Sequence, residues 1–218
     1  MTKLESTPTT TVSLTVNGEE YTKETEDRRL LVHFLREELG LTGTHQGCVV
    51  GKCGACTILH DGVPKKSCLL YAVQMDGAEI TTVEGLAEIA AEQNNAVQTQ
   101  EGTTLHPLQM GFKQNHGLQC GFCTPGFLMT AHALLEENDD PSRAEIKAAI
   151  SGNICRCTGY NSIVDSIEWA SAALETGESQ PVPDGGNSDA CCGGECIEQI
   201  DYPQTDIATK SAEDLCDE

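Results

Sequence analysis

Apolar and polar residues alternate near the start of the sequence. From Thr11 to Val16 the apolar residues fall on every second position, and Asn17-Gly18 follows. Alternation with a period of two predicts a half-buried β-strand, and Asn-Gly is the pair typical of a two-residue hairpin turn. Glu19 to Glu24 is therefore expected to return as a second strand. The same signals predict another hairpin, with strands at 57–60 and 63–66 around Asp61-Gly62.

Between the two hairpins the apolar positions change to a helical period. Residues 28–39 place five large apolar side chains on one helical face, and Gly40 follows as a candidate C-terminal cap. Residues 43–56 are rich in Gly and Cys and fit no regular period. A short helix is expected at Cys68 and a last strand from Glu79 to Val83. These elements predict a small β-rich domain that ends near residue 83.

Beyond this point the periodicity is helical. Helices are predicted at residues 85–93, 106–115, from 124 onward, 142–150 and 163–174. Thr81 with Glu84, and Ser142 with Glu145, have the spacing of a capping box, and Thr124-Pro125 is typical of an N-cap followed by a first-turn proline. No internal repeat relates the two halves. The predicted fold class is therefore α+β, a β-rich domain followed by an all-α domain and an irregular tail.

Eight of the twelve cysteines form two groups of four with unlike spacings. The first group is Cys48, Cys53, Cys56 and Cys68, and its first three members have the spacing of plant-type [2Fe–2S] ferredoxins. Zinc usually takes two short-spaced pairs, which the gap between Cys48 and Cys53 fits poorly. The flanking glycines would let the backbone approach an inorganic core closely; they are Gly47, Gly51 and Gly54. The first group therefore predicts an iron–sulfur cluster.

The second group consists of Cys120, Cys123, Cys155 and Cys157. A Cys-x2-Cys pair with a distant Cys-x-Cys pair is compatible with zinc as well as with a cluster, so the spacing alone leaves both open. Because the two groups lie on different predicted folds, they indicate two separate metal centres in one chain.

The residues around these cysteines closely resemble the signature of the molybdenum hydroxylases, which include xanthine dehydrogenase, aldehyde oxidoreductase and aerobic carbon monoxide dehydrogenase. The resemblance extends over about residues 11–172 and is carried by Gly43-Thr44-x-x-Gly47-Cys48, Cys53-Gly54-Ala55-Cys56, and the runs 119–126 and 152–160. It implies a plant-type ferredoxin-like β-grasp domain at residues 11–84 and a helical domain at 85–176. Each domain would hold one [2Fe–2S] cluster. Residues 1–10 would form an N-terminal extension and 177–218 an acidic tail.

The resemblance also implies a role. The chain would be the electron-transfer subunit of a heteromeric molybdenum hydroxylase, with no catalytic residues of its own and no turnover when alone. Electrons would pass from molybdopterin on a large subunit, through both clusters, toward FAD on a medium subunit, in a dimer of heterotrimers. Gln119 would hydrogen-bond the pterin and Cys157 would lie beside it. The run 117–126 leans toward the carbon monoxide dehydrogenase-like group, although the substrate itself is not encoded here.

Charge and composition argue against several classes of binding partner. The 218 residues carry a formal charge of −21, and Ser171 to Glu218, with twelve acidic residues and one basic one, accounts for −11 of it. The remaining −10 argues against nucleic acid and anionic membranes as partners. No apolar run approaches the roughly 18 residues of a membrane span, and an apolar signal segment is absent from the first residues. We expect a cytoplasmic protein whose cysteines bind metal rather than form disulfides.

The last four cysteines fall in the tail, at Cys191, Cys192, Cys196 and Cys216. Four thiols suffice for a third metal site. The surrounding Pro-, Gly- and Asp-rich composition instead predicts a flexible acidic extension or a docking segment. The sequence is compatible with both interpretations.

Two other classes of function compete with the electron-transfer subunit: a free-standing ferredoxin-type carrier, and a redox or metal sensor built on the tail. A soluble carrier needs no pterin contact, so Gln119 argues against the first. Lys52 is either a residue that raises the first cluster's potential or a solvated lysine. Arg156, between two second-group cysteines, is either a charge partner of the cluster or a surface residue.

Overall fold

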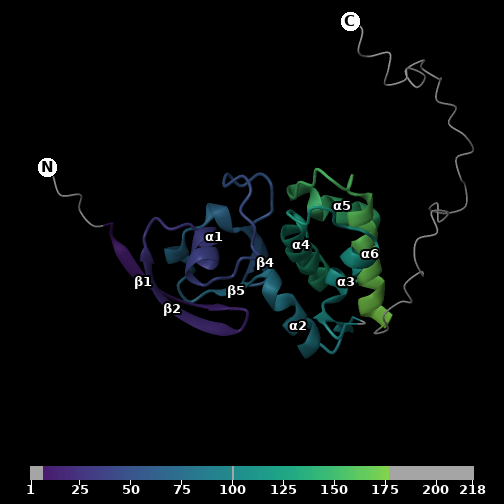
Figure 1. Cartoon of the computed structure of the whole chain (residues 1–218), viewed down its shortest axis with the longest axis horizontal. Helices are drawn as coiled ribbons and strands as arrows, with labels where there is room; N and C mark the ends of the chain where they lie inside the picture. The colour runs from purple at the N-terminus through teal and green to yellow at the C-terminus, as the bar shows by residue number, and fades with distance from the viewer. Residues whose placement is uncertain (1–6, 100, 177–218) are drawn as a thin grey trace, which may run out of the picture. The chain divides into compact units, whose positions relative to one another are not determined.

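The computed structural model describes residues 7–99 and 101–176, and its first domain is built on a mixed five-stranded sheet (Figure 1). β1 runs parallel to β5, and all other neighbouring strands are antiparallel. Both predicted hairpins are present, and Asn17, Gly18, Asp61 and Gly62 all have the positive φ angles that a type I′ turn requires. In sheet order the strands are β2 (Glu19–Glu26), β1 (Thr9–Val16), β5 (Glu79–Thr81), β3 (Thr57–His60) and β4 (Val63–Lys66).

The helix predicted for residues 28–39 begins later, at Leu31. It consists of α1 (Leu31–His33) and a π-helical turn, η1 (Phe34–Glu38). The backbone before it is extended, because Leu30 pairs with Tyr71 and the Arg29 carbonyl accepts the Ala72 N–H at 2.8 Å. The predicted C-terminal cap is present: Gly40 has φ of 76°, and the Leu41 N–H donates to the Leu35 carbonyl at 2.9 Å.

The segment after β4 replaces regular helix by short 3₁₀ turns, η2 (Ser67–Leu69) and η3 (Ala72–Met75). The last strand ends at Thr81, so the capping box predicted for Thr81 and Glu84 is wrong. Thr82 stands before the 3₁₀ turn η4 (Val83–Gly85) without a side-chain cap. The Glu84 carboxylate instead accepts the Thr82 hydroxyl at 2.6 Å and the Gly43 N–H at 2.7 Å, so it anchors the first cysteine loop.

The second domain is helical, as predicted. A two-stranded ribbon that the sequence did not predict, β6 (Val97–Gln98) with β7 (Thr104–Leu105), is too short to show a period. The Ser142 capping box is confirmed, whereas Cys123 and not Thr124 occupies the N-cap of its helix. The helices are α2 (Leu86–Glu92), α3 (Pro107–Gln114), α4 (Thr124–Glu137), α5 (Arg143–Ala149) with the 3₁₀ turn η5 (Ile150–Gly152), and α6 (Asn161–Thr176).

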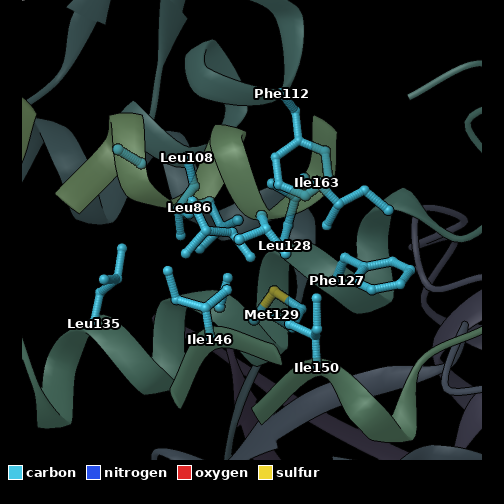
Figure 2. Packing of buried hydrophobic residues seen from close by; sticks show 14 of the residues in the cluster. Leu86, Leu108, Phe112, Phe127, Leu128, Met129, Leu135, Ile146, Ile150 and Ile163 are labelled. Carbon is cyan, nitrogen blue, oxygen red and sulfur yellow. The ribbon is translucent and has the colours of Figure 1, made fainter. Parts of the chain in front are cut away.

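The buried side chains form two main clusters, and Leu59 of β3 belongs to the cluster of the helical domain. Leu31, Phe34 and Leu35 of the first helical segment pack on the sheet residues Val12, Leu14 and Ile80, all of them buried. In the helical domain, side chains from α3, α4 and α6 meet in one cluster. Figure 2 shows Phe112, Leu128 and Ile163 of this cluster pointing into the same space. These two cores support the loops that carry the cysteines.

The buried histidines of the helical domain predict acid sensitivity. Burial, reinforced by neighbouring His132, lowers the pKa of His106 to about 3, and burial also lowers the pKa of His132 against the opposing charge of Glu136. Unfolded histidine titrates near 6.5. Between pH 6.5 and 3 the unfolded state therefore binds more protons, and the free energy of unfolding falls as the pH drops. For His106 the expected loss is about 2 kcal/mol at pH 5 relative to pH 7.5.

The His106→Asn variant measures this contribution, since Asn keeps the N-cap acceptor that His106 offers to the Leu108 N–H at 3.1 Å. Thermal unfolding at pH 7.5 and pH 5 should show a smaller loss for the variant than for the wild type. Equal losses would show that His106 does not stay neutral in the folded protein.

Among the described residues, none of the helices is long and apolar enough to cross a membrane. The tail predicted from residue 177, with Cys191, Cys192, Cys196 and Cys216, lies outside the described residues, as do residues 1–6.

Candidate iron–sulfur sites

The first four cysteines are brought together by the loop between η1 and β3 and by the turn η2. Their thiols approach one another in pairs, Cys48 with Cys53 and Cys56 with Cys68. Cys56 and Cys68 are buried, while Cys48 and Cys53 are half-buried. Burial raises the pKa of Cys56 to about 11, so that thiol needs a metal to hold it as a thiolate. One pair thus faces the interior and the other the rim of the domain.

Backbone N–H groups surround the Cys48 sulfur. The N–H groups of Val50, Lys52 and Cys53 lie 3.5, 3.3 and 3.3 Å from its Sγ. These hydrogen bonds, that of Val50 first, lower the pKa of the Cys48 thiol to about 6. The loop reaches this conformation through positive φ angles at Val49 (55°) and Gly51 (73°). The local backbone therefore favours a thiolate at Cys48.

The second four cysteines lie on the loops before α4 and before α6. Their thiols also pair, Cys120 with Cys157 at 3.6 Å and Cys123 with Cys155. The first pair is exposed, whereas Cys155 is buried and Cys123 half-buried. Burial raises the pKa of Cys123 to about 12.

The neighbours of Cys155 and Cys157 shape this second site. Burial opposes ionisation of Cys155, but hydrogen bonds led by the Thr158 hydroxyl outweigh it and lower its pKa. Gln119 is exposed next to the outer pair, and its Nε2 donates to the Cys157 carbonyl at 3.2 Å. Gln119 and Cys157, which the resemblance placed together, are therefore adjacent at the surface.

The two cysteine loops contact each other directly. The Ile154 N–H, next to Cys155, donates to the Cys53 carbonyl at 2.9 Å. Asn153 is buried and donates to the Gly54 carbonyl at 3.1 Å, and its Oδ1 accepts the Thr130 hydroxyl at 3.1 Å. One hydrogen bond thus joins the backbone of a cysteine in the first group to the residue before a cysteine in the second.

Sequence reasoning missed the residues that hold this contact. Asn153 lies within the run that carried the resemblance, and a polar residue two positions before a cysteine was the available signal. His45 stacks on Phe122 with ring centroids 5.0 Å apart. Its Nδ1 lies 2.8 Å from the Phe122 carbonyl oxygen. The side chains of Lys52 and Arg156 are exposed.

Within each group the thiols approach one another in pairs, an arrangement suited to a two-iron cluster. Four thiolates around one zinc ion would all be equivalent neighbours, whereas here each thiol has one close partner. Two pairs of thiols fit a core in which each of two irons takes two ligands. The fold and these two groups of four cysteines are suited to an iron–sulfur protein.

Comparison with known proteins identifies both domains. Residues 14–87 match the family described as "2Fe-2S iron-sulfur cluster binding domain", and residues 82–168 match the "[2Fe-2S] binding domain". The chain is 48% identical to the caffeine dehydrogenase subunit gamma of Pseudomonas sp. (strain CBB1), over 78% of this chain and 95% of that protein. It is 47% identical to the nicotine 6-hydroxylase small subunit of Paenarthrobacter nicotinovorans, over 72% and 86% of the two chains.

Solved structures agree with these relatives. The quinoline 2-oxidoreductase of Pseudomonas putida 86 superposes with a TM-score of 0.67 at 46% identity, covering 76% of this chain and 94% of that chain. The chain therefore belongs to the molybdenum hydroxylase family, as a small iron–sulfur subunit of an oxidoreductase.

Proposed function

We propose that this chain passes electrons from the molybdopterin centre of its enzyme through two [2Fe–2S] clusters toward FAD. Cys48, Cys53, Cys56 and Cys68 would hold one cluster, and Cys120, Cys123, Cys155 and Cys157 the other. Each close pair of thiols would ligate one iron. When bound, the clusters supply one-electron storage. The single observation that carries the proposal is the 2.9 Å hydrogen bond between Ile154 and Cys53, which joins two sets of paired thiols.

The exposure of the thiols supports one direction of electron transfer through the chain. Cys120 and Cys157 are the exposed pair, and Gln119 presents its amide beside them. This edge is suited to contact molybdopterin on a large subunit. Cys155 lies at the opposite, buried side, where its loop meets Cys53. Electrons would enter at the helical domain and leave from the ferredoxin-like domain toward FAD on a medium subunit.

The arrangement of the complex is part of the same proposal. We place the boundary between the two cluster domains at residues 84–85, where the two family matches overlap. The large and medium subunits would assemble with this chain as a dimer of heterotrimers in the cytoplasm. The relatives named as subunits of dehydrogenase and hydroxylase enzymes support a multi-subunit assembly.

The substrate class proposed for the whole enzyme is an N-heterocyclic compound. The relatives' names specify caffeine, nicotine and quinoline, each of which contains a nitrogen heterocycle. The similarity of residues 117–126 to the carbon monoxide dehydrogenase-like group stays a prediction. This chain would have no direct role in substrate specificity, since the substrate would bind at molybdenum on another subunit.

Isolation of the native complex through a tag on this chain tests the proposal. We expect molybdenum, flavin and about four iron atoms per chain, two from each cluster. Anaerobic addition of caffeine, nicotine or quinoline should then reduce both clusters, with carbon monoxide as the comparison. A chain that purifies alone, with its clusters but without molybdenum, would support the free-standing carrier instead.

A further inference from the structure

Lys66 ends β4 with its ammonium group against the first cysteine loop. Its Nζ donates to the Gly51 carbonyl at 2.8 Å, and the side chain is half-buried. Strand pairing with Thr57 holds its backbone, and the next residue, Ser67, donates its hydroxyl to the Cys56 carbonyl at 2.8 Å. The backbone of Lys66 is therefore fixed by strand pairing, and its side chain lies at a defined place beside the loop.

The bond from Lys66 ends on the peptide group that faces Cys48. The carbonyl of Gly51 and the N–H of Lys52 belong to one peptide unit. That N–H lies 3.3 Å from the Cys48 sulfur. The peptide thus has a positive charge at its oxygen end and the sulfur at its hydrogen end. Hydrogen bonds in such a chain polarise one another, and a bond to an ionised donor is stronger than a neutral one.

The surroundings keep this arrangement in place. Gly51 has φ of 73°, and a Cβ there would lie 2.5 Å from the Leu69 side chain, so the peptide is confined against the turn that carries Cys68. On its other side the ammonium is 3.7 Å from where a Cβ of Gly152 would stand, in the loop of the second cysteine group. The ammonium therefore lies between the two cysteine loops.

We propose that Lys66 is a positioning residue that raises the reduction potential of the first cluster through the Gly51–Lys52 peptide. The inference rests on the proposed ligation of that cluster by Cys48. Reduction makes the cluster more negative, and hydrogen bonds to a ligand sulfur stabilise the more negative form. By polarising the peptide and holding its N–H toward Cys48, Lys66 favours the reduced state. The sequence had singled out Lys52, whose side chain is exposed and whose backbone N–H is what faces the sulfur.

Three substitutions at Lys66 separate charge from hydrogen bonding. Lys66→Arg keeps the charge, Lys66→Gln keeps only a neutral donor, and Lys66→Met removes both. The matched controls are Lys65→Met, on the same strand with an exposed side chain, and Lys52→Met. The measurement is a redox titration of the native complex followed by electron paramagnetic resonance, with the signal of the first cluster assigned through a Cys48→Ser variant.

We expect Lys66→Met to shift the reduction equilibrium of the first cluster about tenfold toward the oxidised form, which for one electron lowers the midpoint by about 59 mV. Lys66→Gln should fall between Met and the wild type, Lys66→Arg should stay near the wild type, and neither control should move the potential. If the Lys66→Met variant loses iron, the midpoint potential of the Lys66→Gln variant serves as the test instead. A wild-type potential in Gln and Met variants with full iron content, or an equal shift in Lys65→Met, would overturn the inference. Failure to find about four irons in the wild-type chain would contradict the proposed function instead.

Discussion

Replacing Cys155 by serine is expected to remove the second cluster and leave the first one in place. Cys155 is 6% exposed and pairs with Cys123, so its loss leaves one iron of that cluster without a buried ligand. The iron content of the purified complex should fall from about four to about two atoms per chain. Reduction of the first cluster by substrate should cease, because the route from molybdenum is interrupted. Iron analysis and paramagnetic resonance measure both effects.

Two companion variants complete this experiment. Cys53→Ser should remove the other cluster, with substrate still reducing the one that remains. Truncation after Glu178 removes Cys191, Cys192, Cys196 and Cys216 and should keep about four irons. Full iron content in Cys155→Ser would contradict the ligand assignment, and iron lost on truncation would place metal in the tail.

Gly126→Ala is expected to force the two cysteine loops apart. A Cβ at Gly126 would lie 2.1 Å from the Gly54 carbonyl oxygen and 3.0 Å from Nδ2 of Asn153. Because the first of these is a backbone atom, a side-chain rotation cannot relieve the clash. Overpacking of this kind costs about 1–3 kcal/mol. The shift should also strain the bond from Ile154 to Cys53, so the second cluster should be reduced by substrate at its normal rate and the first more slowly.

Gly152→Ala provides the matched control at the same contact. Its added Cβ would meet nothing closer than the Lys66 Nζ at 3.7 Å, an ordinary van der Waals distance. We expect a change within about 0.5 kcal/mol. Thermal unfolding and rapid-mixing reduction of the complex, performed on both variants, give the comparison. Equal behaviour of the two variants would show that the Gly126–Gly54 contact does not control the docking of the loops.

Local rules predicted the elements whose determinants are adjacent in the sequence. The turns at Asn17-Gly18 and Asp61-Gly62 and the cap at Ser142 depend on a few neighbouring residues, and the structure has all of them. The helix start near Arg28 was wrong, since the Arg29 carbonyl and Leu30 bond to residues 72 and 71. The predicted N-cap at Thr124 was also wrong, because Cys123 occupies the N-cap position of α4.

The sequence by itself determined the two cysteine groups, the two-domain order and the family, because ligand spacing and the glycines around it are properties of short continuous segments. Only the tertiary structure decided which thiols pair and how the groups connect. The bond from Asn153 to Gly54 spans 99 positions, and that from Lys66 to Gly51 crosses from a strand to a loop. Such contacts depend on how the sheet and the helices pack and where their loops then lie, which no local pattern of residues encodes.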